Sequence, residues 1–325
     1  MLPGVYHENV RVIGKNIRII SSKGADSTVL ISASGGSPIV LLDGTNDFSR
    51  FEGFTVESGG ITIGVPAAIL LQNSSGYVQN NVIQNISGVP AIRTQGESPK
   101  IISNVLRLNA GNRLIEFVSV NPLLQRNLIV ENRNDWLVYV VDSFLAINNT
   151  IANNSGPYGI FFTGTNAGSK ILNNIFANLN TGVSGGSYAV TMSYNDFFQV
   201  TVPSTDPLDT GNIFTDPLFK GGQPFDYSLE RESPCVDAGD PGTPIPPGGG
   251  SRVDIGAFEF VPNRGDLDRD GMFSPADVVL ELNCIFLLIG DCPLEVADLN
   301  CDGQLSPADV VLLLNLVFLG ILPPC

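Results

Sequence analysis

Ile101-Ile102-Ser103-Asn104-Val105-Leu106 is a short apolar stretch that is interrupted by a turn at Ser103 and Asn104. Its motif, an asparagine followed by two apolar residues, returns along the chain at a nearly constant interval. The copies begin at Asn81, Asn104, Asn127, Asn149, Asn174 and, with a looser match, Asn195. Subtracting successive positions gives intervals of 23, 23, 22, 25 and 21 residues. A period in this range indicates stacked supersecondary units.

The residues between these turns favour strands. A leucine-rich repeat would require Leu at fixed offsets and a helical segment, and neither is present. Short apolar alternations broken by Gly, Ser and Asn suit parallel strands whose side chains point alternately inward and outward. Asparagines at the same turn of successive coils can form a ladder of amide hydrogen bonds. Partial copies at Asn16-Ile17 and Gly53-Phe54 extend the pattern towards the N-terminus.

This pattern resembles the right-handed parallel β-helix of the pectate-lyase-like superfamily, an all-β solenoid. The resemblance covers residues 1–261 and predicts about 8 coils at the observed period. Residues 212–260 look like the closing section of bacterial secreted β-helix proteins, which we expect to cap one end of the stack. Members usually have Ala where this chain has Cys235, so that thiol is interpreted as a small buried residue. The resemblance implies a lyase, a hydrolase or a non-catalytic binder of polysaccharides.

A second repeat organises the C-terminal region. Asp266-Leu267-Asp268-Arg269-Asp270-Gly271 returns 32 residues later as Asp298-Leu299-Asn300-Cys301-Asp302-Gly303, and each copy continues into Ser-Pro-Ala-Asp-Val-Val. Oxygen-bearing side chains at loop positions 1, 3, 5 and 12 with Gly at position 6 suit Ca²⁺. One copy could be an ordinary acidic turn, but two are hard to produce by chance. The predicted ligands are Asp266, Asp268, Asp270, the Met272 carbonyl and Asp277 in the first loop, and Asp298, Asn300, Asp302, the Gln304 carbonyl and Asp309 in the second. The sequence therefore predicts two calcium ions.

Each predicted loop leads into a short apolar helix, over residues 278–289 and 310–319, and no helix is expected before either loop. This loop–helix duplication, over residues 262–325, resembles the type I dockerin, a calcium-dependent module that binds cohesin domains in bacterial extracellular assemblies. The resemblance implies a cohesin-like scaffold as partner and a partner-binding surface at loop positions 10 and 11. Those positions hold Pro275, Ala276, Pro307 and Ala308, where better-known members often have hydroxyl residues. Because this tail is strongly acidic, we expect it to fold poorly without metal.

Four of the five cysteines lie in the tail: Cys284, Cys292, Cys301 and Cys325. Dense cysteine in a small module indicates an oxidising compartment. Candidate disulfides are Cys284–Cys292 and Cys301–Cys325, although four cysteines allow three pairings. Zinc is disfavoured because Cys-x2-Cys spacing is absent and His7 is the only histidine.

No catalytic cluster stands out in the solenoid sequence. The acids of the central coils are Glu116, Glu131, Asp135, Asp142 and Asp196, and the bases are Arg107, Arg113, Arg126, Arg133 and Lys170. An inverting hydrolase needs two carboxyl groups, and a lyase needs a base with a neutralising cation. Neither set forms a recognisable motif, so these residues are interpreted as solvated positions on the coils. Trp136 is expected to pack or to flank a groove.

The net charge of −15 argues against nucleic-acid binding and against attachment to anionic membranes. No stretch is long and apolar enough to predict a transmembrane segment. The first residues resemble the middle of a first coil and carry no signal peptide. We therefore expect an extracellular or cell-surface protein whose natural N-terminus is missing from this chain. Its predicted role is polysaccharide degradation, with non-catalytic binding or a structural surface role as alternatives.

Overall fold

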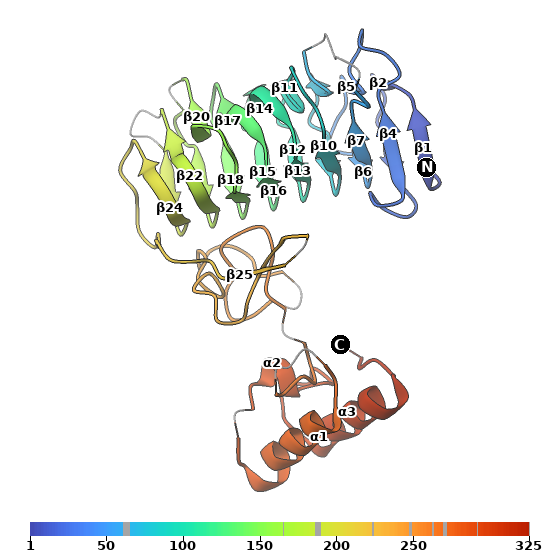
Figure 1. Cartoon of the computed structure of the whole chain (residues 1–325), viewed down its shortest axis with the longest axis vertical. Helices are drawn as coiled ribbons and strands as arrows, with labels where there is room; N and C mark the ends of the chain where they lie inside the picture. Colours follow the sequence, from blue (N-terminus) through green and yellow to red (C-terminus); the bar gives the residue numbers. More distant parts are fainter. Residues whose placement is uncertain are drawn as a thin grey trace. The chain divides into compact units, whose positions relative to one another are not determined.

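The computed structural model describes residues 1–60, 66–164, 166–185, 190–222, 224–246, 249–261, 263–268, 272–290 and 292–324. The chain forms two compact units, Met1–Glu259 and Phe260–Cys325. Figure 1 shows stacked strands in the first unit and helices in the second. None of the helices that the structure describes is long and apolar enough to cross a membrane.

The first unit is a parallel β-solenoid, as the sequence predicted, and its strands line three faces. The first face contains β1 (Gly4–His7), β4 (Thr28–Ile31), β7 (Thr55–Glu57), β10 (Val82–Gln84), β13 (Val105–Arg107), β16 (Leu128–Val130), β19 (Thr150–Ala152) and the first parts of β22 (Ile175–Ser184) and β24 (Asp196–Ser204). The second face contains β2 (Val10–Ile13), β5 (Val40–Asp43), β8 (Ile69–Gln72), β11 (Ile92–Gly96), β14 (Ala110–Ser119), β17 (Arg133–Val140), β20 (Tyr158–Phe162) and the last parts of β22 and β24. The third face contains β3 (Arg18–Ile20), β6 (Arg50–Glu52), β9 (Tyr77–Gln79), β12 (Lys100–Ile102), β15 (Leu123–Gln125), β18 (Leu145–Ile147), β21 (Lys170–Leu172) and β23 (Thr191–Ser193). Eight strands on the third face correspond to the eight predicted coils.

An asparagine ladder fixes the turn from the third face to the first. The residue before each ladder position has a positive φ, for example 53° at Ser103. Its left-handed backbone conformation turns the chain from the third face to the first. Asn104 Nδ2 then donates to Asn127 Oδ1 at 3.0 Å, and Asn127 Nδ2 donates to Asn149 Oδ1 at 3.0 Å. The predicted ladder is confirmed, and it runs from Asn81 to Asn212.

A second ladder lies at the turn from the first face to the second. Asn109 Nδ2 donates to Asn132 Oδ1 at 3.0 Å, and Asn132 Nδ2 donates to Asn154 Oδ1 at 3.0 Å. Each of these asparagines follows a first-ladder asparagine by five residues. Two of the three turns of these coils are therefore held by buried amides.

One of the two partial N-terminal copies falls at the predicted turn. Gly53 has a φ of 80°, and Phe54 N donates to Asn81 Oδ1 at 3.0 Å, so this pair continues the ladder position. The prediction that Asn16-Ile17 is a copy of the ladder motif was wrong. It precedes β3 of the third face, and its Oδ1 accepts from Asn46 N at 2.9 Å at a different corner.

Inward-facing apolar side chains stack from coil to coil inside the solenoid. On the first face, Ile83, Leu106, Ile129, Ile151 and Phe176 lie in register, and all are fully buried. Phe51 and Phe54 stack at 4.6 Å where the ladder lacks an asparagine. Each coil buries its apolar side only against its neighbours, so stability depends on continuous stacking.

The closing section packs against the outer side of the first face. It includes the antiparallel pair β25 (Phe219–Gly221) and β26 (Asp226–Leu229). Val130, Ala152 and Ala177, which point outward from the solenoid, form one buried cluster with Tyr227, Leu229, Cys235 and Ile255 of this section. It therefore covers the flank of the later coils in addition to following the last one. Cys235 is a fully buried free thiol, as predicted.

The second unit contains α1 (Pro275–Leu282), the π-helical turn η1 (Asn283–Leu287), α2 (Leu294–Ala297) and α3 (Pro307–Leu319). Ser274 and Ser306 cap α1 and α3, and the side chains of Asp277 and Asp309 accept from the capping residues' N–H groups. The expectation that no helix precedes either loop was wrong for the second loop, because α2 ends directly before Asp298. A four-residue helix after Pro293 is too short to show an apolar period in the sequence.

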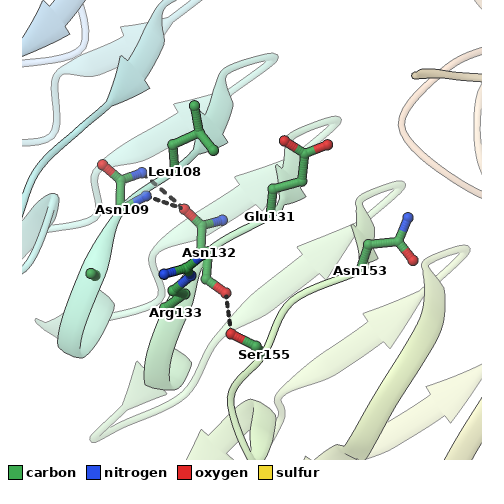
Figure 2. Close-up of a pocket in the computed structure, with 8 residues that line it drawn as sticks. Leu108, Asn109, Glu131, Asn132, Arg133, Asn153 and Ser155 are labelled. Carbon is green, nitrogen blue, oxygen red and sulfur yellow. Dashed lines mark hydrogen bonds between the residues drawn. The ribbon is translucent and has the colours of Figure 1, made fainter. Parts of the chain in front are cut away.

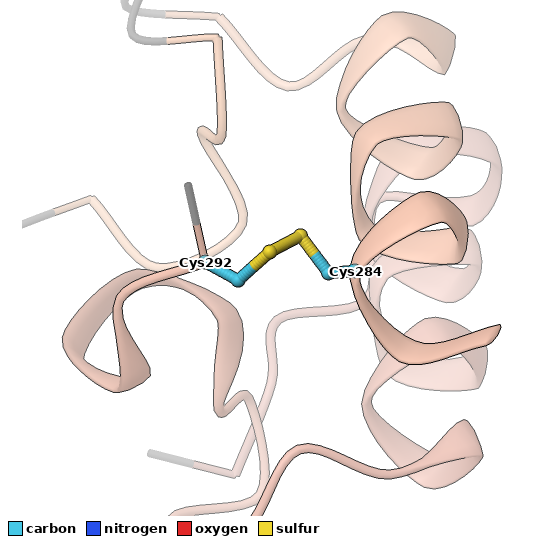
Figure 3. Close-up of a disulfide and its surroundings, with 2 residues drawn as sticks. All are labelled: Cys284 and Cys292. Carbon is cyan, nitrogen blue, oxygen red and sulfur yellow. A yellow bond between two sulfur atoms is a disulfide. The ribbon is translucent and has the colours of Figure 1, made fainter. Parts of the chain in front are cut away.

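The disulfide Cys284–Cys292 joins η1 to the segment before α2 (Figure 3), with the Cα atoms 5.9 Å apart. This predicted pairing is confirmed. Cys301 is also disulfide-bonded, and Cys325, its predicted partner, lies outside the described residues. Leu267, Val278, Leu299 and Leu313 form the core that joins the two loop–helix repeats.

Candidate functional site

Four partly exposed aromatic side chains lie together on the outer side of the second face. Trp136 and Tyr139 belong to β17, and Tyr158 and Phe161 occupy the matching positions of β20. The rings of Trp136 and Tyr158 are 6.4 Å apart and nearly parallel, at 10°. Tyr139 and Phe161 are 6.0 Å apart, at 22°. Two adjacent coils thus present one aromatic surface, which we call the aromatic platform.

Two arginines and one glutamate extend this platform along the solenoid. The Arg113 guanidinium lies 3.8 Å from the Tyr139 ring centroid and forms an ion pair with Glu116. Arg93, one coil earlier, lies 3.3 Å from the other Glu116 oxygen. Glu116 is only 4 % exposed, so its interpretation as a solvated position was wrong. Its two oxygens are engaged by two guanidinium groups, which orient both arginines at the edge of the platform.

The platform has a regular sequence signature that was missed. Arg93, Glu116, Tyr139 and Phe161 each lie 12 residues after a first-ladder asparagine, and the register pairs them in one row. Arg113, Trp136 and Tyr158 lie nine residues after one and form a second row. Once the ladder fixes the register, equal offsets place side chains side by side. Applying the ladder offset to every residue would therefore have revealed the cluster.

A pocket of about 220 Å³ adjoins the arginine end of the platform. Arg93, Asn112, Arg113 and Glu116 provide its polar lining, and Pro66, Gly88, Val89 and Pro90 complete it. The Nε atoms of Arg93 and Arg113 are buried and have no acceptor among the residues that the structure describes. Together the pocket and the platform form a cationic recess next to a flat aromatic surface.

A larger pocket of about 500 Å³ lies at the second ladder (Figure 2). Leu108, Glu131 and Asn153 occupy its left-handed turn positions, and Arg133 contributes a guanidinium group. The lining residues are Leu108, Asn109, Ala110, Glu131, Asn132, Arg133, Asn153 and Ser155. They include one carboxylate and no aromatic ring. This pocket lacks both the acid pair of a hydrolase and a stacking surface.

Two carboxyl groups of the first unit, Asp196 and Glu259, have raised pKa values and structural partners. Burial raises the pKa of Asp196 to about 7, and its oxygens lie 3.1 Å from Thr215 N and 3.5 Å from Cys235 Sγ. Asp196 is fully buried, so the solvated interpretation was wrong here also. In the closing section, burial raises the pKa of Glu259 to about 7, and nearby Asp254 adds to the effect. These groups secure the closing section and do not line either pocket.

The first predicted calcium loop brings its acidic side chains together. Ligand atoms of Asp266, Asp268 and Asp277 lie within 4.8 Å of one another. Asp277 is fully buried, and its Oδ1 accepts from Leu267 N at 2.8 Å and Asp268 N at 3.1 Å. Asp270 lies outside the described residues. Three converging carboxylates repel one another unless a cation neutralises them, so these residues fit Ca²⁺.

The second loop repeats the hydrogen bonds that the first loop makes at its last ligand position. Asp309 Oδ1 accepts from Leu299 N at 3.0 Å and Asn300 N at 3.1 Å. Asp298 Oδ2 accepts from Gly303 N at 2.9 Å, which wraps the chain around the first ligand position. Asp302 Oδ1 accepts from Gln304 N at 2.9 Å. Convergence of three carboxylates within 4.8 Å is found in the first loop only among the described residues, so the calcium ligands of the second loop stay a prediction.

The helices of the second unit expose large apolar side chains. The predicted partner-binding residues Pro275, Ala276, Pro307 and Ala308 are all exposed. Positions related by the 32-residue offset are exposed alike: Val279 and Val311, Leu282 and Leu314, Phe286 and Phe318, and Leu287 and Leu319. The two helices pack apolar side chains against each other in the core of the unit. Only one side of each helix does so, because the helices are apolar all round.

No family model and no curated protein matches the chain. Among solved structures, the pectate lyase Pel9A aligns with it at 14 % identity and a TM-score of 0.38, covering 79 % of this chain and 87 % of that one. The strand order and register described above, rather than this similarity, establish the parallel β-solenoid.

Proposed function

We propose that the solenoid binds an extended polysaccharide along its second face. The observation that supports this is the aromatic platform, in which Trp136, Tyr139, Tyr158 and Phe161 present partly exposed rings over two adjacent coils. Sugar rings have apolar faces that pack against flat aromatic side chains, while their hydroxyl groups need polar partners at the rim. A repeating surface suits a repeating ligand.

The charge at the edge of the platform indicates which saccharides bind best. Arg93 and Arg113 carry two positive charges and Glu116 one negative charge, in a chain whose net charge is −15. This local excess of positive charge favours acidic saccharides over neutral ones at the recess. Glu116 also keeps the guanidinium groups in place, which lowers the entropic cost of binding.

Binding without cleavage is better supported than hydrolysis at this pocket. Both Glu116 oxygens are engaged by arginines, and this glutamate is the carboxylate of the adjoining pocket. Glycoside hydrolysis requires carboxyl groups that are available to donate or accept a proton at the substrate. Polysaccharide cleavage, by a lyase or a hydrolase, remains the alternative that the same experiment tests.

The test is retention on a panel of immobilised acidic and neutral polysaccharides, with product analysis of the supernatant. We expect the wild-type chain to be retained most strongly by an acidic member. Trp136→Ala with Tyr158→Ala should weaken retention roughly 10-fold or more, because stacked aromatic contacts contribute about 0.5–1.5 kcal/mol each. Phe48→Ala, which removes an exposed ring beside the third face, is the matched control.

Each outcome separates the candidate functions. Equal retention of the double variant and the wild type would remove the platform from the proposal. New reducing ends or unsaturated products from the wild type would establish an enzyme. If the wild-type chain neither binds nor cleaves any polysaccharide of the panel, the result would favour a structural surface role.

We also propose that the second unit is a dockerin-like module that binds two calcium ions and tethers the chain to a cohesin-like partner at a cell surface. The converging carboxylates of the first loop support calcium binding, and the backbone hydrogen bonds that Asp309 shares with Asp277 extend the proposal to the second loop. The exposed apolar pairs on α1, η1 and α3 and the flanking Pro275 and Pro307 support docking. The disulfide Cys284–Cys292 supports an extracellular location. Calorimetric titration of the whole chain with calcium should give two sites, and a chain that binds none would refute this part.

A further inference from the structure

Glu281 of α1 is a buried carboxyl group without hydrogen-bond partners. The residue has no exposed surface, and neither Oε1 nor Oε2 has a partner among the described residues. Leaving an ionised carboxylate in such a place costs free energy unless an opposite charge compensates it. The side chain therefore needs either a proton or a cation nearby.

The 32-residue repeat locates this carboxyl group. Glu281 corresponds to Leu313 of α3. Leu313 covers the residue immediately before the first loop, since a methyl group added to Gly265 would lie 2.8 Å from Leu313 Cδ1. The counterpart of Gly265 is the fully buried Ala297, which immediately precedes the second loop. The repeat thus places Glu281 over the entrance of the second loop.

Independent observations agree with that placement. Gly265 N donates to Val296 O at 2.8 Å, so the entrances of the two loops lie side by side in the unit. Burial raises the pKa of Glu281 to about 8, and the charge of Asp309 in the second loop adds to the rise. The Glu281 carboxyl group on α1 therefore interacts electrostatically with Asp309, a predicted ligand of the second loop.

The ligand sets of the two loops differ by one charge. The first predicted set has four carboxylates, from Asp266, Asp268, Asp270 and Asp277. The second has three, because Asn300 stands where the first loop has Asp268. A fourth carboxylate from Glu281 would make the two sites equal in charge.

We propose that Glu281 supplies the missing negative charge to the cation of the second loop, so that the first repeat completes the metal site of the second. This inference rests on the proposed binding of calcium by both loops. The cation compensates the buried carboxylate, and the carboxylate strengthens the hold on the cation. The two repeats are coupled as a result. The Glu281 carboxylate on α1 is neutralised only when the second loop holds its cation.

The test isolates each loop in the full-length chain and measures calcium affinity by calorimetry at one pH. Asp277→Ala inactivates the first loop and Asp309→Ala inactivates the second. In the Asp277→Ala background, Glu281→Gln should weaken the remaining site about 10-fold, which is about 1.4 kcal/mol. In the Asp309→Ala background, the same substitution should leave the remaining affinity unchanged.

A compensating variant keeps the test specific to charge. Adding Asn300→Asp to Glu281→Gln restores a fourth carboxylate within the second loop, and we expect it to recover most of the lost affinity. Glu281→Leu, which copies Leu313, should raise the melting temperature of the second unit in EDTA while weakening the second site.

The outcomes distinguish this inference from the proposed function. If Glu281→Gln leaves the calcium affinity unchanged in the Asp277→Ala background, the proposed role of Glu281 is overturned. An equal loss in both backgrounds would indicate general damage to the unit and would overturn it too. Absence of calcium binding by the wild-type chain would instead refute the proposed function itself.

Discussion

Asn127 shows how a single side chain holds a corner of the solenoid. Its Nδ2 donates to Ile101 O at 2.9 Å and to Asn149 Oδ1 at 3.0 Å. Its Oδ1 accepts from Asn104 N at 2.9 Å and Asn104 Nδ2 at 3.0 Å. One buried amide thus satisfies groups of three successive coils, none of which water can reach.

Asn127→Ala should destabilise the solenoid by about 2–4 kcal/mol, because it leaves several buried polar groups unpaired. The urea midpoint followed by far-UV circular dichroism measures the change. Asn112→Ala removes an exposed amide from a neighbouring coil and is expected to stay within about 0.5 kcal/mol of wild type. Equal midpoints for the two variants would contradict the role of the ladder.

Asp196 makes solenoid stability depend on pH. Its pKa rises on folding from 3.8 to about 7 because the carboxyl group is buried. Between these values the folded chain keeps a proton that the unfolded chain releases, so the contribution of Asp196 to stability falls as pH rises from about 4 to about 7. Asp196→Asn should remove this slope. Urea midpoints of both proteins across that range test it, and parallel curves would refute the assignment.

The helical elements of the second unit differ although their sequences repeat. α3 continues to Leu319, whereas α1 ends at Leu282 and passes into the π-helical turn η1. Cys284 lies in η1 and is tied to Cys292, a constraint for which the matching part of α3 has no cysteine. The disulfide thus fixes the end of the first repeat at an element that is not a regular α-helix.

Replacing Cys284 and Cys292 together by Ser should destabilise the second unit by about 2–3 kcal/mol, since the closed loop is short. The melting temperature of the unit in calcium gives the readout. Cys235→Ser, which changes the buried free thiol of the solenoid, should leave that melting transition in place. If the double variant and Cys235→Ser shift this melting transition equally, the result would contradict a local effect of the disulfide.

β17 and β20 show why the aromatic platform depends on register. A shift of one residue would turn Tyr139 and Phe161 inward and expose the buried Val138 and Ile160. The asparagine ladders at the two turns on either side of the first face set this register and bring the rings together.

The whole chain combines two units that are stabilised differently. The solenoid is held by a continuous apolar stack and amide ladders, neither of which requires a metal. The second unit has a small core and converging carboxylates at Asp266, Asp268 and Asp277. Its folding is therefore expected to depend on calcium.

EDTA should unfold residues 264–325 and leave the β-sheet signal of the solenoid unchanged. Circular dichroism with and without calcium, combined with limited proteolysis, would show loss of the helical signal and cleavage within the tail only. A spectral change that extends to the β signal would contradict the separate stabilisation of the two units, and an equally ordered tail in EDTA would contradict its dependence on metal.

The repeat period and the apolar alternation predicted the parallel solenoid and its first ladder, and a separate 32-residue repeat predicted two oxygen-rich loops. The residues concerned recur at fixed spacing and act through local turns. The family resemblance predicted the burial of Cys235, and Cys284–Cys292 was one of the pairings that the sequence left open. Only the tertiary structure revealed the burial of Glu116 and Asp196, the aromatic platform and the location of Glu281. These depend on which outer positions another segment covers and which residues about one coil apart lie side by side. Such contacts arise from register and packing across the fold, which no short stretch of the chain contains.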